Sequence, residues 1–88
     1  MATLHLVSTL AGLRPCLEVA ADDDAILLIA NGVYAAVPAA APPRDLLALD
    51  ADVAARGLQR RLGERVRVVD DGEFVALAAT HQPIVSWR

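Results

Sequence analysis

Short apolar runs of strand length recur along the chain, separated by polar or proline-containing segments. The clearest run covers residues 25–29 and contains no polar residue. An unbroken run of this length is typical of a strand that is covered on both faces, so we predict that it is central in a sheet. Four further runs predict strands, at residues 1–8, 45–49, 65–69 and 83–87. The alternation of arginine and valine at 65–69 and the proline at the start of 83–87 predict that these two strands lie near the edges of the sheet.

Turn and capping residues between the first runs predict short helices and connections. Pro15 fits the first turn of a helix, where its missing N–H costs nothing, so residues 9–13 are expected to be a loop. Asn31 and Gly32 predict a turn that leads into a helix start. The prolines within residues 38–43 predict an extended connection.

Two further helices are predicted in the second half of the chain, each with an aspartate as its N-cap. Asp50 is expected to cap a helix that runs to about Leu62, with Gly57 weakening its middle. Asp70 or Asp71 is expected to cap the last helix. We interpret the run of aspartates at 22–24 as a solvated loop.

The alternation of strands and helices predicts the fold class. We expect one α/β domain spanning residues 1–88, a three-layer Rossmann-like sandwich around a small, mostly parallel sheet of about five strands. Right-handed crossovers would place the end of each strand and the start of the next helix on one edge of the sheet. On that carboxyl edge we expect residues 9–16, residues 31–34, Asp50, Asp70 and Asp71, and on the opposite edge residues 22–24, Gly63 and His81.

Composition and charge favour a subunit of an assembly and argue against a nucleic-acid-binding or membrane protein. The chain is 56% hydrophobic but only 3% aromatic, with a mean hydropathy of +0.42, which predicts surplus apolar surface for a partner subunit. The net charge is −3 and the eight basic residues are all arginine, so direct nucleic-acid binding is not expected. No apolar stretch is long enough for a membrane helix and no signal peptide is evident, which predicts a cytoplasmic protein.

Cys16, the single cysteine, is the candidate catalytic residue. In the first turn of a helix, free N–H groups and the helix dipole would stabilise its thiolate. The structural alternative is a small buried apolar residue. We expect His81 on the wrong edge and His5 in a structural role, so neither is placed to act as a base. Cysteine-protease chemistry is therefore disfavoured, whereas passing sulfur between thiols needs no base.

Other chemistry has little support in the sequence. The glycines do not form a phosphate-binding loop, and one cysteine excludes an internal disulfide and a cysteine-based zinc site. Asp50, Asp70 and Asp71 suit helix capping better than metal binding or acid/base catalysis. We therefore predict no cofactor and no metal. Arg56, Arg60 and Arg61 most simply form a solvated helix face, with an acidic partner or an RNA backbone as the alternative use.

The order of several segments resembles the TusB/DsrH family over nearly the whole chain. The segments are Leu4-His5-Leu6-Val7, Cys16-Leu17, Ala25-Ile26-Leu27-Leu28-Ile29, Gly32-Val33-Tyr34-Ala35-Ala36, Leu47-Ala48-Leu49-Asp50, Ala55-Arg56-Gly57-Leu58, Phe74-Val75, His81 and Ser86-Trp87.

The resemblance implies a DsrE-like fold and a place in a heterohexameric sulfur-relay complex. The implied partners are TusC/DsrF-like and TusD/DsrE-like subunits and a downstream TusE/DsrC-like sulfur acceptor. A homo-oligomer is the alternative for the isolated chain. The Tus branch passes persulfide sulfur towards 2-thiolation of the wobble uridine of tRNA, and the Dsr branch serves sulfur oxidation. Cys16 resembles the thiol of DsrH-type members, although the main active cysteine of such complexes belongs to the TusD/DsrE-type partner.

The chain departs from the family pattern at three places. Asn31 replaces the usual acidic residue before Gly-Val, and Ser8-Thr9-Leu10 replaces a common Ser-Pro. The connection after Val37 is shorter and richer in proline, so the family's second helix is expected to be reduced to a turn.

Three hypotheses follow from these observations. In the first, the chain is a sulfurtransferase-complex subunit for tRNA thiolation with Cys16 as a persulfide carrier. In the second, it is a non-catalytic scaffold of that complex, or a DsrH-type subunit in sulfur oxidation. In the third, it is a stand-alone binding protein that forms a homo-oligomer.

Overall fold

The computed structural model describes residues 2–39 and 42–88, within which strands and helices alternate as the sequence predicts. Met1, which belongs to the first predicted strand, and residues 40–41 of the predicted connection lie outside the described residues. In chain order the elements are β1 (Leu4–Val7), α1 (Leu10–Val19), β2 (Ala25–Leu28), the 3-10 helix η1 (Ala30–Ala36), β3 (Leu46–Leu49), α2 (Asp50–Ala55), β4 (Val66–Val69), α3 (Asp71–Thr80) and β5 (Ile84–Trp87).

The strands form one five-stranded sheet in the order β4-β3-β2-β1-β5, and every neighbouring pair is parallel. β2 is the middle strand, which confirms the prediction from its unbroken apolar run. β4 and β5 are the edge strands, also as predicted. The α/β fold class with a small parallel sheet is therefore confirmed.

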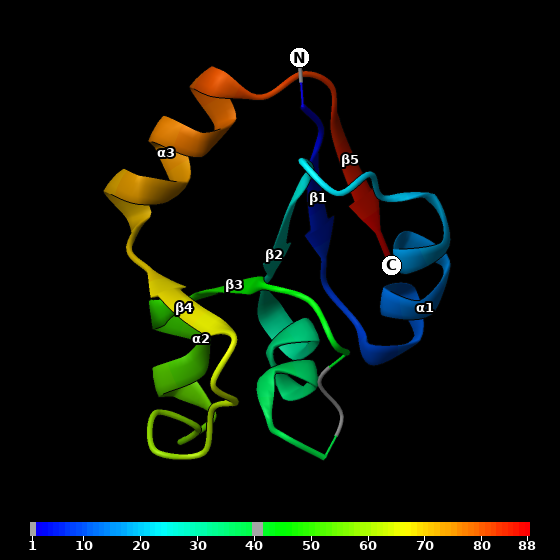
Figure 1. Cartoon of the computed structure of the whole chain (residues 1–88). Coiled ribbons are helices and arrows are strands. Elements are labelled where there is room, and N and C mark those ends of the chain that lie inside the picture. The colour runs from blue at the N-terminus through cyan, green and yellow to red at the C-terminus, as the bar shows by residue number, and fades with distance from the viewer. Residues whose placement is uncertain (1, 40–41) are drawn as a thin grey trace.

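Helices lie on both faces of the sheet and create three layers. One face packs against α1, η1 and α2, and we call it the covered face. The other face packs against α3 alone, and we call it the α3 face. Figure 1 shows α3, in orange, on the side of the sheet away from α1. Side chains alternate between the faces along each strand, so in β2 Ile26 and Leu28 join the covered face while Leu27 joins the α3 face.

Helix α1 begins earlier than the sequence predicts. It starts at Leu10, because the side chain of Thr9 caps it and accepts a hydrogen bond from the Gly12 N–H at 3.0 Å. The prediction that residues 9–13 form a loop is wrong, and Pro15 lies inside the helix rather than in its first turn. Gly12 lets this first turn approach β5 closely, since a Cβ there would lie 3.1 Å from the Trp87 carbonyl carbon and oxygen.

Two other helix boundaries differ from expectation. Helix α2 ends at Ala55 instead of near Leu62, because Gly57 adopts a positive φ of 66° and stops the helix. Asp50 is the first residue of α2 and makes no capping hydrogen bond, so the prediction of an Asp50 cap is wrong. Asp70 does cap α3, as predicted, in a reciprocal capping box with Glu73.

The segment after β2 also differs in detail. Asn31 and Gly32 lie inside η1 rather than in a separate turn before a helix. Gly32 is required there because a Cβ would overlap the carbonyl oxygen of Val7. The described residues of the following connection, 38–39 and 42–45, form turns and bends without a helix, in agreement with the expected reduction of the family's second helix. Within the described residues, no helix is long and apolar enough to cross a membrane.

Candidate functional site

Cys16 lies in the second half of α1 and is fully buried against the covered face. Burial raises the pKa of its thiol to about 11, an effect that the nearby Arg44 charge opposes and the Asp24 charge reinforces. The expected position in the first turn of a helix is wrong, so free N–H groups do not stabilise a thiolate here. In this conformation the thiol is protonated at neutral pH and shielded from solvent.

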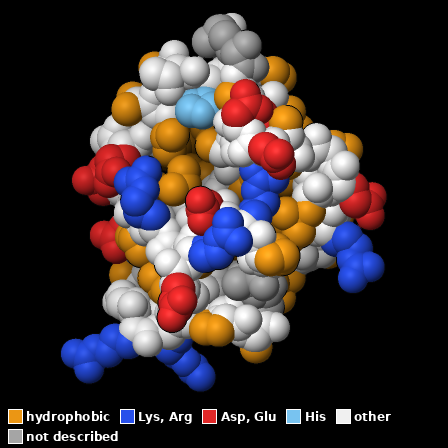
Figure 2. All heavy atoms as spheres, viewed as in Figure 1, with side chains coloured by type: hydrophobic (Ala, Val, Ile, Leu, Met, Phe, Trp, Pro, Cys, Tyr) orange, Lys and Arg blue, Asp and Glu red, His pale blue; other side chains and the backbone are white. Residues whose placement is uncertain are grey.

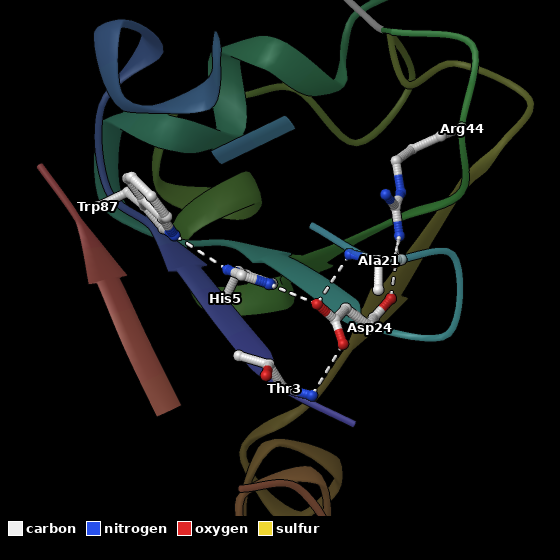
Figure 3. A network of polar contacts seen from close by, with 6 residues as sticks. All are labelled: Thr3, His5, Ala21, Asp24, Arg44 and Trp87. Carbon is white, nitrogen blue, oxygen red and sulfur yellow. Dashed lines mark hydrogen bonds and ion pairs between the residues drawn. The ribbon is translucent and has the colours of Figure 1, made fainter. Parts of the chain in front are cut away.

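A network of polar side chains extends from the Asp24 turn at the amino edge of the sheet, through the buried His5, to Trp87 at the end of β5 (Figure 3). His5 of β1 is 3% exposed and lies between two partners that are distant in the sequence. Its Nε2 is 2.9 Å from Asp24 Oδ2, and its Nδ1 accepts a hydrogen bond from Trp87 Nε1 at 3.0 Å. The network joins three strands, because Asp24 immediately precedes β2 and Trp87 ends β5.

The partners of His5 determine its tautomer. The indole N–H of Trp87 only donates, so Nδ1 of the neutral ring has to accept, and the proton is on Nε2. That proton is donated to the Asp24 carboxylate. Both ring nitrogens are therefore occupied, and His5 is not available as a base. The predicted structural role of His5 is confirmed.

Asp24 is the most heavily bonded side chain of the network. Its carboxylate accepts hydrogen bonds from His5 Nε2, the Thr3 N–H and the Ala21 N–H, each at 2.9 Å. These bonds, with the His5 bond first, lower the pKa of Asp24 from 3.8 to about 2. Arg44 braces the same turn by donating to the carbonyl oxygens of Ala21 and Asp24 at 3.0 and 3.1 Å. The interpretation of residues 22–24 as only a solvated loop is wrong for Asp24.

The carboxyl edge carries a second, smaller set of polar contacts. Asp52 of α2 accepts a hydrogen bond from the Ala30 N–H at 2.8 Å, where Ala30 has a positive φ of 48°. Arg56 forms an ion pair with Asp52 and donates to Asn31 Oδ1 at 2.9 and 3.1 Å. These contacts fix η1 against α2.

The remaining predicted site residues lie apart from one another. Asp70 caps α3 through its bond to Glu73, while Asp71 is the exposed first residue of that helix. His81 lies at the amino edge, as expected, with its Nδ1 2.9 Å from the Leu77 carbonyl oxygen. Among the described residues, no three His, Cys, Asp or Glu side chains are grouped closely enough to hold a metal ion.

Sequence reasoning missed Asp24, Trp87 and Asp52 as residues with specific partners. A buried histidine requires partners for both ring nitrogens, and an aspartate directly before the central parallel strand is close to the start of its neighbour. These two signals point to a His5–Asp24 pair. The Trp87 and Asp52 contacts depend on tertiary packing and have no comparable local signal.

Comparisons with known proteins give consistent results. The model of the family described as "DsrH like protein" matches residues 8–84. Protein TusB of Enterobacter sp. (strain 638) is 33% identical over 84 residues, which covers 88% of each chain. Protein TusB of Escherichia coli O1:K1 is 30% identical over 92 residues, which covers 97% of each. The crystal structure of the ychN protein from E. coli superposes with a TM-score of 0.68 at 12% identity, covering 99% of this chain and all of the other, so it supports the fold alone.

Proposed function

The chain belongs to the TusB/DsrH family. We propose that it is a scaffold subunit of a cytoplasmic sulfur-relay complex, and that this complex supports 2-thiolation of the tRNA wobble uridine. The observation that carries this proposal is the match to TusB proteins over nearly the full chain. The proposed partners are homologous TusC/DsrF-like and TusD/DsrE-like subunits and a TusE/DsrC-like sulfur acceptor.

Exposed apolar side chains support a role as a subunit. Val75 of α3 is 68% exposed, Val19 of α1 is 62% exposed and Ile84 of β5 is 47% exposed. A chain of this size gains from covering such residues, because its own core removes only part of its apolar surface from water.

The state of Cys16 favours the scaffold role over the carrier role. A persulfide carrier has to present its sulfur to a donor and an acceptor, and it reacts as the thiolate. Cys16 is fully buried and the pKa of its thiol is raised to about 11. The reactive cysteine is accordingly proposed to belong to a partner chain.

A second candidate function keeps Cys16 as the persulfide carrier. It is favoured by one observation, that Cys16 is the only thiol of a chain from a sulfur-relay family. This role requires α1 to move away from the sheet during transfer, because the thiol is enclosed between them.

One experiment separates the two roles. The chain is purified with its proposed TusC/DsrF-like and TusD/DsrE-like partners, and the complex is loaded with labelled sulfane sulfur. Transfer to the acceptor is then followed for wild type and Cys16→Ala. The scaffold role predicts the same transfer rate in both and no added sulfur mass on Cys16. Sulfur mass on Cys16, together with loss of transfer in the variant, would establish the carrier role.

A second measurement tests the family function itself. Deleting the gene should abolish tRNA 2-thiolation, and the Cys16→Ala gene should restore it. Unchanged thiolation in the deletion strain, with loss of sulfur oxidation instead, would assign the chain to the DsrH-type role. Failure of any homologous subunit to co-purify would contradict membership in a complex.

A further inference from the structure

A groove of about 670 Å³ runs between the end of η1 and the loop that follows α2. Most of its lining is apolar, and the two walls come from segments that are distant in the sequence. Its apolar lining includes Tyr34, Val37, Leu58 and Leu62, and its charged lining residues are Arg60 and Arg61. We call this the Arg60/Arg61 groove.

The charged side chains that line the groove are all basic. Arg60 and Arg61 are exposed, and neither forms an ion pair or a side-chain hydrogen bond with another described residue. The lining contains no acidic side chain. In Figure 2, basic side chains project into solvent at the end of the molecule where Figure 1 places the loop after α2. This local positive charge stands out on a chain whose net charge is −3.

The aromatic wall of the groove is fixed in place. The Arg56 guanidinium lies 5.9 Å from the centre of the Tyr34 ring and is itself held by Asp52 and Asn31. Tyr34 nevertheless remains 42% exposed. A ring that is held in position while exposed offers contact area at low conformational cost.

We propose that the Arg60/Arg61 groove binds a short acidic segment of a partner protein in which apolar side chains alternate with carboxylates. The apolar lining would take the apolar side chains, and the two arginines would pair with carboxylates, which match the guanidinium geometry. A nucleic acid fits less well, because it needs many phosphate contacts and the chain is acidic overall. This proposal goes beyond the scaffold function and does not depend on sulfur chemistry.

The test uses the full chain and a fluorescent peptide of alternating leucine and aspartate, followed by anisotropy. The critical variant is Arg60→Glu/Arg61→Glu. Its matched control is Arg14→Glu/Arg88→Glu, which changes the net charge equally at two exposed arginines outside the groove. We expect saturable binding to wild type and to the control, and about tenfold weaker binding to the groove variant.

Three further probes make the result specific. A peptide of alternating serine and aspartate, one of alternating leucine and lysine, and a single-stranded oligouridine should all bind much more weakly than the leucine–aspartate peptide. Equal weakening by the control variant would overturn the proposal, because only net charge would then matter. Tighter binding of oligouridine than of the acidic peptide, or no saturable peptide binding, would also overturn it. Circular dichroism of both variants verifies that they are folded.

Discussion

The two faces of the sheet use the same kinds of apolar side chain, but the chain covers them to different extents. On the covered face, Ile26, Leu28 and Leu46 are at most 1% exposed beneath α1, η1 and α2. On the α3 face, Leu4 and Leu27 are equally buried, yet the flanking apolar residues remain partly exposed. Those flanking residues are Leu6, Ala25, Ile29, Leu47 and Leu49.

The helices differ in the same way as the faces. Helix α1 and η1 each contribute several buried residues, whereas α3 contributes none. The residues of α3 that face the sheet, Phe74, Leu77 and Ala78, are only partly buried. Stability should therefore be concentrated on the covered face, because the cost of a substitution follows the packing it disturbs.

The largest effect is expected for Val53→Lys on the covered face. Val53 of α2 is 1% exposed, so the substitution would bury an ammonium group without a partner. We expect a loss of about 4 kcal/mol or more in the free energy of unfolding, which is enough to unfold a domain of this size. Circular dichroism and urea unfolding measure it. A cooperative transition at the wild-type midpoint would show that the covered face is not the main core.

The next effect comes from a pair of glycines on opposite faces. Gly32→Ala places a Cβ against the Val7 carbonyl oxygen, so the sheet and η1 have to separate, at a cost of about 3 kcal/mol. Gly72→Ala in α3 meets only the Asp70 side chain, at 3.4 Å, and should be neutral or slightly stabilising because alanine favours helix. Thermal unfolding compares the two. Equal losses would contradict the difference between the faces.

A pH-dependent effect is expected at Asp24, a member of the His5 network that ties β5 to β1 and β2. The pKa of Asp24 is lowered from 3.8 to about 2, so its carboxylate stabilises the fold above about pH 4, and this contribution is lost as the pH falls towards 2. Asp24→Asn should cost about 2.5 kcal/mol at neutral pH, because charge-assisted bonds to three donors are lost or weakened.

The same variant changes the shape of the stability curve. Urea unfolding from about pH 6 to about pH 2 should show that wild type loses more stability than Asp24→Asn over this interval. Asp23→Asn is the matched control, since Asp23 is an exposed neighbour without a side-chain bond to a described residue. Parallel curves for wild type and Asp24→Asn would rule out the proposed contribution of Asp24.

Cys16→Ser is expected to have a smaller effect on the covered face. The serine hydroxyl would be buried where the thiol now packs, and the polar group costs about 1.5 kcal/mol. Cys16→Ala removes the sulfur without adding a polar atom and should cost about 1 kcal/mol. Reaction of native wild type with a thiol reagent should be slow and should accelerate with urea. Fast labelling of the native chain would show that Cys16 is accessible.

Much of the fold was predictable because strand signals are local. The unbroken run of β2 identified the central strand, and the charged and apolar alternation of β4 indicated an edge. Helix boundaries were less predictable where two local signals compete. Thr9 and Pro15 both mark helix starts, and the structure uses the Thr9 cap while it accommodates Pro15 inside the helix.

The candidate site was less predictable for a related reason. The thiolate hypothesis for Cys16 depended on the helix starting at Pro15, so the earlier start removes its basis. The His5 network joins residues 5, 24 and 87, and only the strand order brings them together. The two faces are covered to different extents because the connecting helices are distributed unequally between them. The sequence does not show on which face each helix packs, and composition indicates only that some apolar surface is left over.

The smallest effect is expected for Val75→Lys on the exposed side of α3, away from the sheet. Val75 is 68% exposed, and lysine favours helix more than valine does. Lysine at this position would also lie four residues after Asp71 on the same helix. An acidic residue that precedes a basic one by four positions forms a favourable charge pair. The free energy of unfolding of the isolated chain should therefore change by less than about 0.5 kcal/mol. Urea unfolding beside Val53→Lys checks this, and a large loss would mean that Val75 contributes to the core of the isolated chain. Because Val75→Lys leaves the isolated chain folded, loss of partner co-purification in this variant would report on the surface of α3 and not on the core.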